Sequence, residues 1–545
     1  MRKKRILFCG EATYLNTGYA TYNREVLKRL YQTGKYELAE FAGYGSPQDP
    51  RSREIPWKFY GVLPDKNNPE QQKEYDSVPT NQFGEWKFEP VLLDFQPDIV
   101  CDIRDFWMMD FQERSPYRPY FKWAIMPTVD AAPQNEQWMA TYCGADAVFS
   151  YSDWGGEILK KESNGRIKYI KSAPPSADAA YQPVLDKKVH KESMGFSEDT
   201  LIIGTVMRNQ RRKLFPDLFD AFRQFLDITD KKNVFLYCHT SYPDLGWDIP
   251  KLINQYGLSN KLIFTYVCPD CGHAFPMYFC DAKTKCSKCG GENAGLSNVQ
   301  KGVSYEFLSN IANTFDLYIQ YANSEGFGLP QVEAAACGVP VMSVDYSAMS
   351  SVIRKLGGTP LTPKALYNEM ETGCDRAVPN NAYTAKKIKE FFDLSAEERD
   401  KLGKQSRKNF EKHYQWDATA KVWEDYFDSV ELKPVEETWK SPPRLHNPET
   451  NIPSGLAPRQ LAQWLIANVL GEPEKLNSYL EARITRDLSY GNYVEGTGDM
   501  YLNEDSYKFV KPNFMPFGIE QAFNMMYSLC MRRNKWEQTR AEVVR

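Results

Sequence analysis

Two glutamates, eight positions apart, flank a glycine-rich turn in the second half of this 545-residue chain. Glu325 follows the apolar, strand-like run 317–320, and Glu333 falls in the helix expected after the turn. Between them, Gly326 and Gly328 let backbone N–H groups approach a ligand closely, and the N-terminus of a helix attracts a diphosphate. One carboxylate could then face a sugar while the other accepts hydrogen bonds from ribose hydroxyls. Taken alone, the two glutamates would suit an ordinary strand–loop–helix unit.

The longer run around the glutamates is more specific. It resembles the glutamate-x7-glutamate motif of retaining glycosyltransferases, especially family 4, and consists of Ser324-Glu325-Gly326-Phe327-Gly328-Leu329-Pro330 and then Glu333. The resemblance implies a GT-B fold, in which two Rossmann-like, doubly wound α/β domains face a cleft. It also implies a nucleoside-diphosphate sugar as donor substrate, with donor-binding roles for Glu325, Gly326, Phe327, Gly328, Leu329 and Glu333.

A basic cluster follows the first strand expected in the second half of the chain. Arg208 and Lys213 match the spacing at which the family places an arginine and a lysine against the donor diphosphate. Such a cationic pair would stabilise the leaving diphosphate, because negative charge grows on it in the transition state. By itself the cluster would favour a basic helix start on the surface, and Arg211 and Arg212 are candidates for solvated residues.

The first half of the chain matches the family less closely. Gly18, in the loop after the first strand, resembles the family's glycine loop beneath the reacting sugar. The histidine that many members carry in this half is missing, and Asp130 stands at the comparable place. We expect Asp130 to contact the donor sugar or the acceptor hydroxyl, with a turn-forming aspartate before Pro133 as the equal alternative. The predicted catalytic residues are therefore Glu325, Asp130, Arg208 and Lys213.

Four cysteines form a second chemical signal. They make two Cys-x2-Cys knuckles, each followed by glycine: Cys268 with Cys271, and Cys286 with Cys289. Four thiolates suit tetrahedral zinc and leave no open position for catalysis, so we expect a structural Zn²⁺. An insertion of this size cannot bury a core, so the metal must hold it together. Cys280 or His273 could replace one ligand.

The elements that must position these residues follow from hydrophobic patterning. Short apolar runs alternate with helical patterns over 5–170 and again from 201 to about 410, which is typical of parallel sheets covered by helices. In the first expected helix, Tyr22, Val26 and Leu30 fall on one face. Both blocks therefore predict doubly wound α/β domains.

The domain organisation follows from where these patterns start and stop. The predicted parts are an N-terminal Rossmann-like acceptor-side domain at 1–178, a C-terminal Rossmann-like donor domain at 195–410, a zinc-ribbon insertion at 265–297, a helix returning toward the N-terminal domain at 411–431, and a helical C-terminal extension at 432–545. The extension suits packing or homo-oligomerisation. The stretch 44–86 is rich in turn-forming residues and is expected to be a long loop or insertion.

Composition limits the partners of the protein. Its 67 basic and 71 acidic residues give a formal charge of −4, which weakens a nucleic-acid interpretation without excluding a local basic face. No stretch approaches about 18 consecutive apolar residues, so no membrane span is expected. Twelve cysteines without a secretory signal indicate reduced thiols, and we expect a soluble, cytoplasmic protein.

The function that these features favour is retaining transfer of a sugar, hexose or pentose, from a nucleoside diphosphate to a hydroxyl acceptor on a glycan, lipid or small molecule. A phage-type DNA glycosyltransferase acting on hydroxymethylated pyrimidines is the alternative, in which the ribbon and the extension would contact the duplex. A third hypothesis is a GT-B module that binds a partner without catalysis. Epimerases and phosphorylases share the fold but match the motif less closely.

Overall fold

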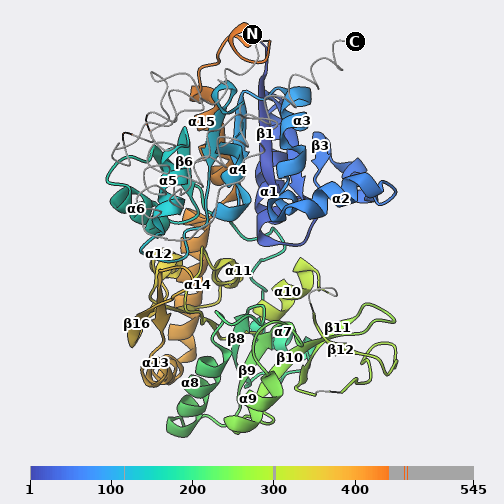
Figure 1. The fold of residues 1–545 in the computed structure, drawn as a ribbon. Coiled ribbons are helices and arrows are strands. Elements are labelled where there is room, and N and C mark those ends of the chain that lie inside the picture. The colour runs from blue at the N-terminus through green and yellow to red at the C-terminus, as the bar shows by residue number, and fades with distance from the viewer. Residues whose placement is uncertain are drawn as a thin grey trace, which may run out of the picture.

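The computed structural model describes residues 2–113, 115, 117–280, 282–298, 302–440, 460 and 463. It consists of two α/β domains, one above the other in Figure 1. Each is built on a mainly parallel sheet with helices around it, so the predicted fold class is confirmed. Within the described residues, no helix combines the length and apolar character needed to cross a bilayer. Beyond residue 440 only Gln460 and Gln463, both helical, are described, so most of the predicted extension lies outside the described residues, as does its predicted role in homo-oligomerisation.

The N-terminal domain contains a seven-stranded parallel sheet in the order β3-β2-β1-β4-β5-β6-β7. Its strands are β1 Lys4–Glu11, β2 Tyr36–Gly43, β3 Lys58–Gly61, β4 Ile99–Asp102, β5 Lys122–Ile125, β6 Ala147–Ser150 and β7 Tyr169–Ser172. Its helices are α1 Gly18–Thr33, α2 Pro69–Ser77, α3 Glu85–Phe95, α4 Asp110–Glu113, α5 Glu136–Cys143 and α6 Asp153–Glu162, with short 3-10 turns between them. The central strands are buried on both faces, which explains why they form continuous apolar runs in the sequence.

The C-terminal domain repeats this plan around an eight-stranded sheet. Along the sheet the order is β11-β10-β9-β8-β13-β14-β15, and β12 also pairs with β10. The strands are β8 Leu201–Val206, β9 Val234–His239, β10 Leu262–Val267, β11 Ala274–Tyr278, β12 Gly295–Leu296, β13 Leu317–Gln320, β14 Val341–Val344 and β15 Thr359–Leu361. The helices are α7 Lys187–Ser193, α8 Phe215–Ile228, α9 Ile249–Gln255, α10 Tyr305–Ala312, α11 Leu329–Ala336, α12 Ser347–Leu356, α13 Asn381–Asp393 and α14 Ala396–His413. A separate hairpin is formed by β16 Ala365–Asn368 and β17 Asp375–Val378.

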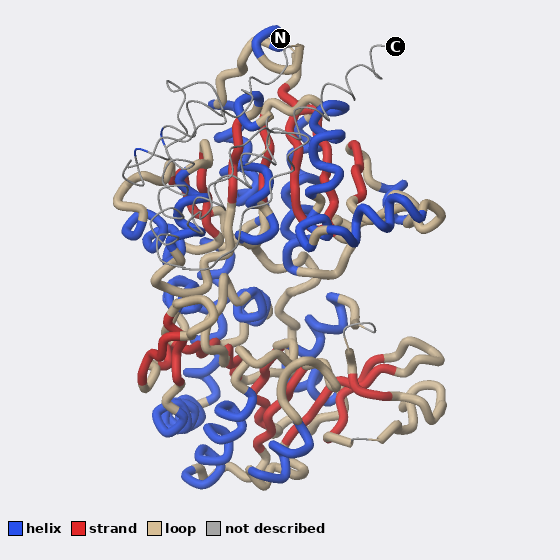
Figure 2. Tube along the Cα trace, viewed as in Figure 1, coloured by secondary structure: helices blue, strands red, loops and turns tan. Residues whose placement is uncertain are grey.

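The prediction of a loop or insertion over 44–86 is wrong in part. This stretch contains β3, which pairs in parallel with β2 at the sheet edge, and α2, which Asn68 caps through its side chain. β3 has only four residues, so its apolar signal is weaker than the surrounding turn signals. Backbone pairing with β2 places it in the sheet (Figure 2).

Helix α1 is built as its pattern predicts. Thr17 caps its N-terminus by accepting a hydrogen bond from the Ala20 backbone N–H, and the helix ends at Gly34. The predicted apolar face is confirmed, because Tyr22, Val26 and Leu30 are all buried. That face packs inside the N-terminal domain and leaves the start of the helix at the cleft.

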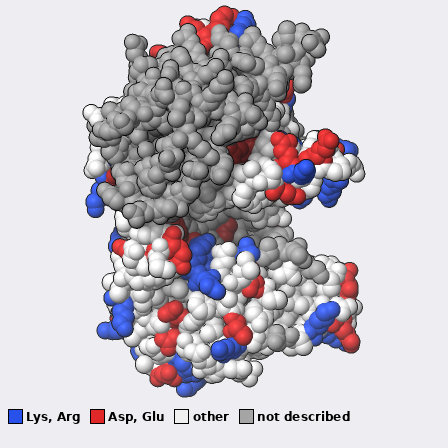
Figure 3. All heavy atoms as spheres, viewed as in Figure 1, with Lys and Arg blue, Asp and Glu red and all other residues white. Residues whose placement is uncertain are grey.

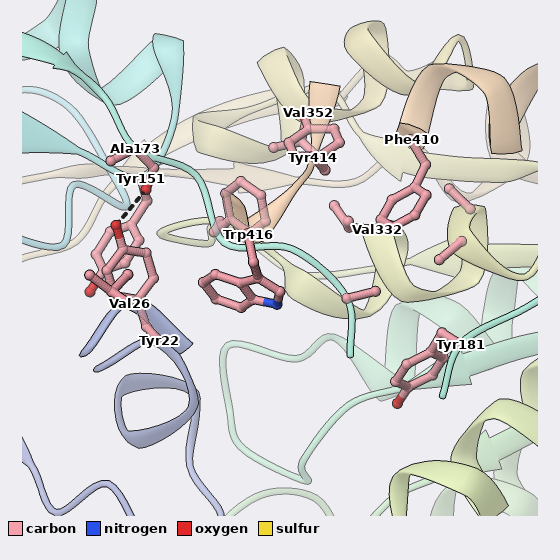
Figure 4. Close-up of a cluster of buried hydrophobic side chains, with 14 of the residues drawn as sticks. Tyr22, Val26, Tyr151, Ala173, Tyr181, Val332, Val352, Phe410, Tyr414 and Trp416 are labelled. Carbon is pink, nitrogen blue, oxygen red and sulfur yellow. Dashed lines mark hydrogen bonds between the residues drawn. The ribbon is translucent and has the colours of Figure 1, made fainter. Parts of the chain in front are cut away.

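A single buried cluster joins the two domains. In Figure 4, Tyr22 and Val26 of α1 and Tyr151 lie in the same region as Tyr414 and Trp416. The cluster continues into the C-terminal domain through Val332 and other side chains. Helix α15, Trp416–Ser429, packs against α1. Its Trp423 is fully buried and donates a hydrogen bond from Nε1 to the Tyr22 hydroxyl at 2.9 Å.

Truncating Trp423 tests whether α15 is anchored in the N-terminal domain, where the Trp423 ring packs against Phe8 and Phe149. We expect Trp423→Ala to lower the free energy of unfolding by about 3–5 kcal/mol, because a large buried side chain and its hydrogen bond are lost. Urea unfolding followed by circular dichroism measures the change. Trp107→Ala is the matched control, since Trp107 is 50% exposed and its loss should change stability by no more than about 0.5 kcal/mol. Equal effects of the two substitutions would contradict the role given to α15.

Candidate active site

The loops at the carboxyl ends of both sheets meet between the domains. Backbone contact is direct, because the Asp375 N–H donates to the Ala132 carbonyl at 2.8 Å. A second contact joins the hydroxyls of Thr21 and Tyr305 at 3.0 Å. Ligands of open α/β sheets bind outside the carboxyl ends of the strands. The cleft between these loops is therefore the place for chemistry.

The turn after β13 is shaped by its glycines. Gly328 has φ +84° and precedes α11, a backbone conformation that a side chain would strain. Gly326 has no room for a side chain, because a Cβ there would lie 2.4 Å from Cγ2 of Thr128 in the other domain. Phe327 packs edge-on against Tyr414 at 5.8 Å, and Leu329 packs against the same buried cluster. Phe327 and Leu329, both predicted to bind the donor, therefore pack their side chains against the buried cluster.

Glu325 lies buried in a ring of hydrogen-bond donors. Its carboxylate forms an ion pair with Lys213, accepts from Arg212 at 2.6 Å and accepts from Gln320 at 2.9 Å. Its backbone N–H donates to the Ser347 hydroxyl at 2.9 Å. Burial lowers the pKa of Lys213 well below its ordinary value, and repulsion from Arg212 adds to this. Two cations and one carboxylate are therefore concentrated at the start of the glycine turn.

Backbone pairing brings the basic loop to Glu325. Lys213 forms an antiparallel bridge with Ala322, and the Asn323 N–H donates to the Arg212 carbonyl at 2.9 Å. Arg208, the other cation of the predicted pair, is 45% exposed and makes a bidentate ion pair with Asp244 instead. Arg212, a candidate for a solvated residue, is 42% exposed, and its guanidinium nevertheless reaches the Glu325 carboxylate. The apolar pattern of the sequence does not indicate this contact between Arg212 and Glu325, because the path of the loop depends on its backbone pairing with the turn after β13.

Asp130 lies at the junction between the domains. Its carboxylate accepts a hydrogen bond from Arg376 of β17 at 2.8 Å, and the Ser324 hydroxyl is 3.4 Å away. Arg376 also pairs with Glu369 at 2.8 Å. Asp130 therefore contacts the residue next to Glu325 and bridges the two domains. Arg376 belongs to no motif recognised in the sequence, and its role depends on the contact that the β16–β17 hairpin makes with the other domain.

Glu333 lies on α11, away from the cations around Glu325. Burial raises the pKa of its carboxyl to about 7, hydrogen bonding with Tyr181 opposes the rise, and Asp178 adds to it. Tyr181 belongs to the segment that links the domains. A carboxyl in this state can exchange its proton near neutral pH.

The N-terminal domain contributes a second polar group to the cleft. The Tyr19 hydroxyl donates to Asp105 at 2.7 Å and lies 2.6 Å from the Thr128 hydroxyl. Gly18, just before Tyr19, is exposed and has open space where a side chain would extend. Asp105 belongs to no motif in the sequence, although its place three residues after β4 follows the rule that strand ends carry ligand-binding groups.

Comparison with known proteins identifies the chemistry. Residues 281–409 match the family described as "Glycosyl transferases group 1". A sucrose-phosphate synthase from Thermosynechococcus elongatus has a similar structure, with a TM-score of 0.55 and 16% identity over 79% of this chain and 100% of that one. The protein is a glycosyltransferase with the GT-B fold. None of the curated protein sequences compared with the chain matches it.

Two other structures similar to this glycosyltransferase were solved with nucleotides. Anabaena Alr3699/HepE in complex with UDP and glucose has a TM-score of 0.53 and 12% identity, over 78% of this chain and 100% of that one. The E. coli structure described as "Trehalose-6-phosphate" bound with UDP-2-fluoro glucose has the same TM-score and identity, over 79% and 100%. At these identities the likeness concerns the fold.

The four predicted cysteines of the glycosyltransferase lie together at the sheet edge. The sulfur atoms of Cys268, Cys271, Cys286 and Cys289 all lie within 4.8 Å of one another. The closest pairs are 3.6 and 3.7 Å apart, near the edge of about 3.8 Å expected for a tetrahedron with 2.3 Å Zn–S bonds. Backbone N–H groups of Lys288 and Gly291 point to two of these sulfurs. The arrangement fits a tetrahedral metal.

The ribbon is joined to the sheet and the core of the C-terminal domain. β11 and β12 pair antiparallel with β10, so the ribbon extends the edge of the domain sheet (Figure 2). Cys268, Cys286 and Phe275 are buried in the core cluster of the C-terminal domain. The ribbon therefore shares that core, and the first knuckle forms the turn between β10 and β11.

The contact between Gly326 and Thr128 can be tested with a pair of substitutions. We expect Gly326→Ala to lower stability by about 1–3 kcal/mol, because the new methyl group overlaps Cγ2 of Thr128 and separates the domains at the cleft. Thr128→Ser removes that methyl group and keeps the hydroxyl. Adding it to Gly326→Ala should restore most of the loss in a thermal unfolding measurement. A loss that remains in the double variant would show that the contact between these two residues is not the cause.

Proposed function

We propose that this enzyme is a retaining, family 4-like glycosyltransferase that moves a sugar from a nucleoside diphosphate to a hydroxyl acceptor. The observation that carries the proposal is the buried Glu325 carboxylate, paired with Lys213 and Arg212 at the start of a glycine turn. A glycine turn directly before a helix suits a sugar diphosphate, because the first N–H groups of a helix have no partner within the helix. The match of residues 281–409 to a glycosyltransferase family covers this turn.

In the proposed reaction the cations work on the leaving group. Lys213 and Arg212 bind the diphosphate and stabilise the charge that develops as the glycosidic bond breaks. Arg208 joins them on releasing Asp244, as the predicted diphosphate pair requires. Glu325 then binds sugar hydroxyls, and Glu333 accepts from the ribose. Retention follows if the acceptor attacks from the face of the leaving phosphate, which takes the acceptor's proton.

The neighbours support a uridine diphosphate sugar as the first donor to test. HepE was solved with UDP and glucose, and the E. coli structure with UDP-2-fluoro glucose. We expect at least one donor among UDP-, GDP- and ADP-linked sugars to raise the melting temperature of the protein and to be hydrolysed slowly by it. A protein that responds to none of them would be a binding module without catalysis.

The role of the cations has a matched control in the same loop. We expect Lys213→Ala to lower kcat by about 10²–10³-fold, because one charge that stabilises the transition state is lost. Arg211→Ala removes the same charge from an exposed neighbour and should leave kcat within a factor of two or so. The anomeric configuration of the product, determined by NMR, tests retention. An inverted product, or equal losses in the two variants, would contradict the proposed mechanism.

Glu333 gives the donor affinity a pH dependence. Because its pKa lies at about 7, the carboxylate that accepts ribose hydroxyls forms as pH rises through that value. Donor affinity should therefore increase between pH 6 and pH 8, by about tenfold, the worth of one hydrogen bond to a charged group. Glu333→Gln should bind the donor weakly with a flat profile. Calorimetry with UDP measures the affinity of the wild type and of the variant at each pH. If the affinity of the variant rises with pH as steeply as that of the wild type, Glu333 does not bind the ribose.

We propose a structural Zn²⁺ for the four cysteines, since a closed four-thiolate set holds the two ribbon knuckles together and leaves no position for substrate. Metal analysis should find one zinc per chain. Cys286→Ser should lose the metal and lower the melting temperature. Cys280→Ser, a half-buried cysteine of the same ribbon, should keep both. Loss of zinc in the Cys280 variant would show that Cys280 is one of the zinc ligands. The reduced thiolates that zinc needs agree with the predicted cytoplasmic setting.

A further inference from the structure

We propose that the acceptor of this enzyme is an uncharged, polyhydroxylated molecule, and that Asp105, Tyr19 and Tyr151 of the N-terminal domain bind it. The proposal rests on the transfer reaction proposed above and names the substrate class at the other side of the same cleft. Its evidence lies in the hydrogen bonding, burial and charge of the residues that follow β1, β4, β5 and β6.

The polar group of the N-terminal domain lies directly against the donor turn. Tyr19, Asp105 and Thr128 form one hydrogen-bonded group, with distances of 2.7 and 2.6 Å. Thr128 also touches Gly326, the residue after Glu325, across the cleft. Asp105 and Tyr19 are close enough to Arg212 to influence its pKa. An acceptor bound at Asp105 would therefore lie beside the proposed sugar site.

A buried hydroxyl at this place lacks a partner. Tyr151 is 8% exposed, and its hydroxyl makes no hydrogen bond within the described part of the chain. Its ring lies 6.5 Å from that of Tyr19, and burial and then the charges of Tyr19, Tyr22, Asp105 and Glu11 raise its pKa. A buried polar group without a partner costs about 1–3 kcal/mol. An acceptor hydroxyl that reached Tyr151 would satisfy it.

The two aspartates at the cleft, Asp130 and Asp105, differ in their contacts. Asp130 is held by Arg376 in the bridge between the domains. Asp105 makes no ion pair among the described residues, and burial raises the pKa of its carboxyl. A carboxylate offers about four acceptor positions, and hydrogen bonds from Tyr19 and Thr128 use two of those on Asp105. The remaining positions of Asp105 are suited to acceptor hydroxyls, so we assign Asp105 rather than Asp130 to the acceptor.

Tyr44 adds an aromatic surface beside these groups. It is partly exposed and lies close enough to Glu11 and Asp105 that their charges contribute to its raised pKa, after burial. Its φ of +57° is unusual for a bulky residue, and such conformations are concentrated at binding sites. Aromatic faces against C–H groups and carboxylates against hydroxyls together suit a sugar or another polyol.

The charge of this wall disfavours a phosphorylated acceptor. Glu11, Asp105 and Asp130 are acidic, and the loops 11–18, 103–108 and 126–133 contain a single basic residue, Arg104. Arg104 is buried and paired with Asp102. Arg212 and Arg376 reach this wall from the other domain, but each is paired with a carboxylate there. A phosphate ester would therefore meet mainly acidic groups, and a duplex would need basic contacts that these loops lack. On the face seen in Figure 3, described basic side chains are interspersed with acidic ones and form no continuous stripe.

The test compares neutral acceptors with charged ones, and glucose and glucose 6-phosphate form the matched pair. With the donor found in the screen, transfer is measured to glucose, maltose, glucose 6-phosphate and duplex DNA containing 5-hydroxymethylcytosine. We expect kcat/KM for a neutral sugar to exceed that for the phosphate ester and the duplex by at least about tenfold, in line with close like charges. Preference for the phosphate ester or the DNA would overturn the proposal.

Two variants separate the acceptor site from the donor site. Asp105→Asn should raise the acceptor KM about tenfold or more and leave the donor affinity and donor hydrolysis unchanged. Tyr151→Phe keeps the packing and should raise the acceptor KM severalfold with an unchanged melting temperature. Asp76→Asn, on the surface helix α2, is the control and should change neither value. Weakened donor binding in the Asp105 variant would overturn the assignment alone, whereas a wild-type enzyme that binds no nucleotide sugar would overturn the proposed function itself.

Discussion

The ion pair between Glu325 and Lys213 is the interaction on which the cleft depends. A carboxylate taken out of water is strongly destabilised unless cations and hydrogen-bond donors surround it. Lys213 and Arg212 meet that need, but only because the loop after β8 pairs its backbone with the turn after β13. The pairing fixes two cations where a diphosphate would lie, so the requirements of a buried glutamate and of the proposed donor are met by the same groups.

The cleft is formed by close contact between the domains. Gly326 lacks a side chain where Thr128 of the other domain approaches, and Arg376 reaches across to Asp130. On the far side of the junction, α15 packs its Trp423 against Tyr22 of α1. Since α1 also carries Tyr19 into the cleft, the same helix connects the packing of the domains with the polar group that we assign to the acceptor.

The ribbon is part of the same architecture. Its strands continue the sheet of the donor domain from β10, and two of its cysteines are buried in that domain's core. A metal there would stabilise a sheet edge as well as the knuckles. This position is lateral to Glu325, because β9 and β8 separate β10 from β13. A structural role for the cysteines is the simplest one that this arrangement supports.

The two α/β domains, the glycine turn with its glutamates and the four cysteines can all be predicted from the amino-acid sequence, because each depends on local pattern or spacing. Alternating apolar runs specify buried parallel strands, and Gly328 is required by the conformation of its own backbone. Only the tertiary structure decided which cation reaches Glu325, that Asp130 is held by Arg376, and that Asp105 faces the cleft. These outcomes depend on loops and strand ends that are far apart in the chain and meet only when the sheets pack. No local pattern encodes them, because the partner of each charge lies on another element.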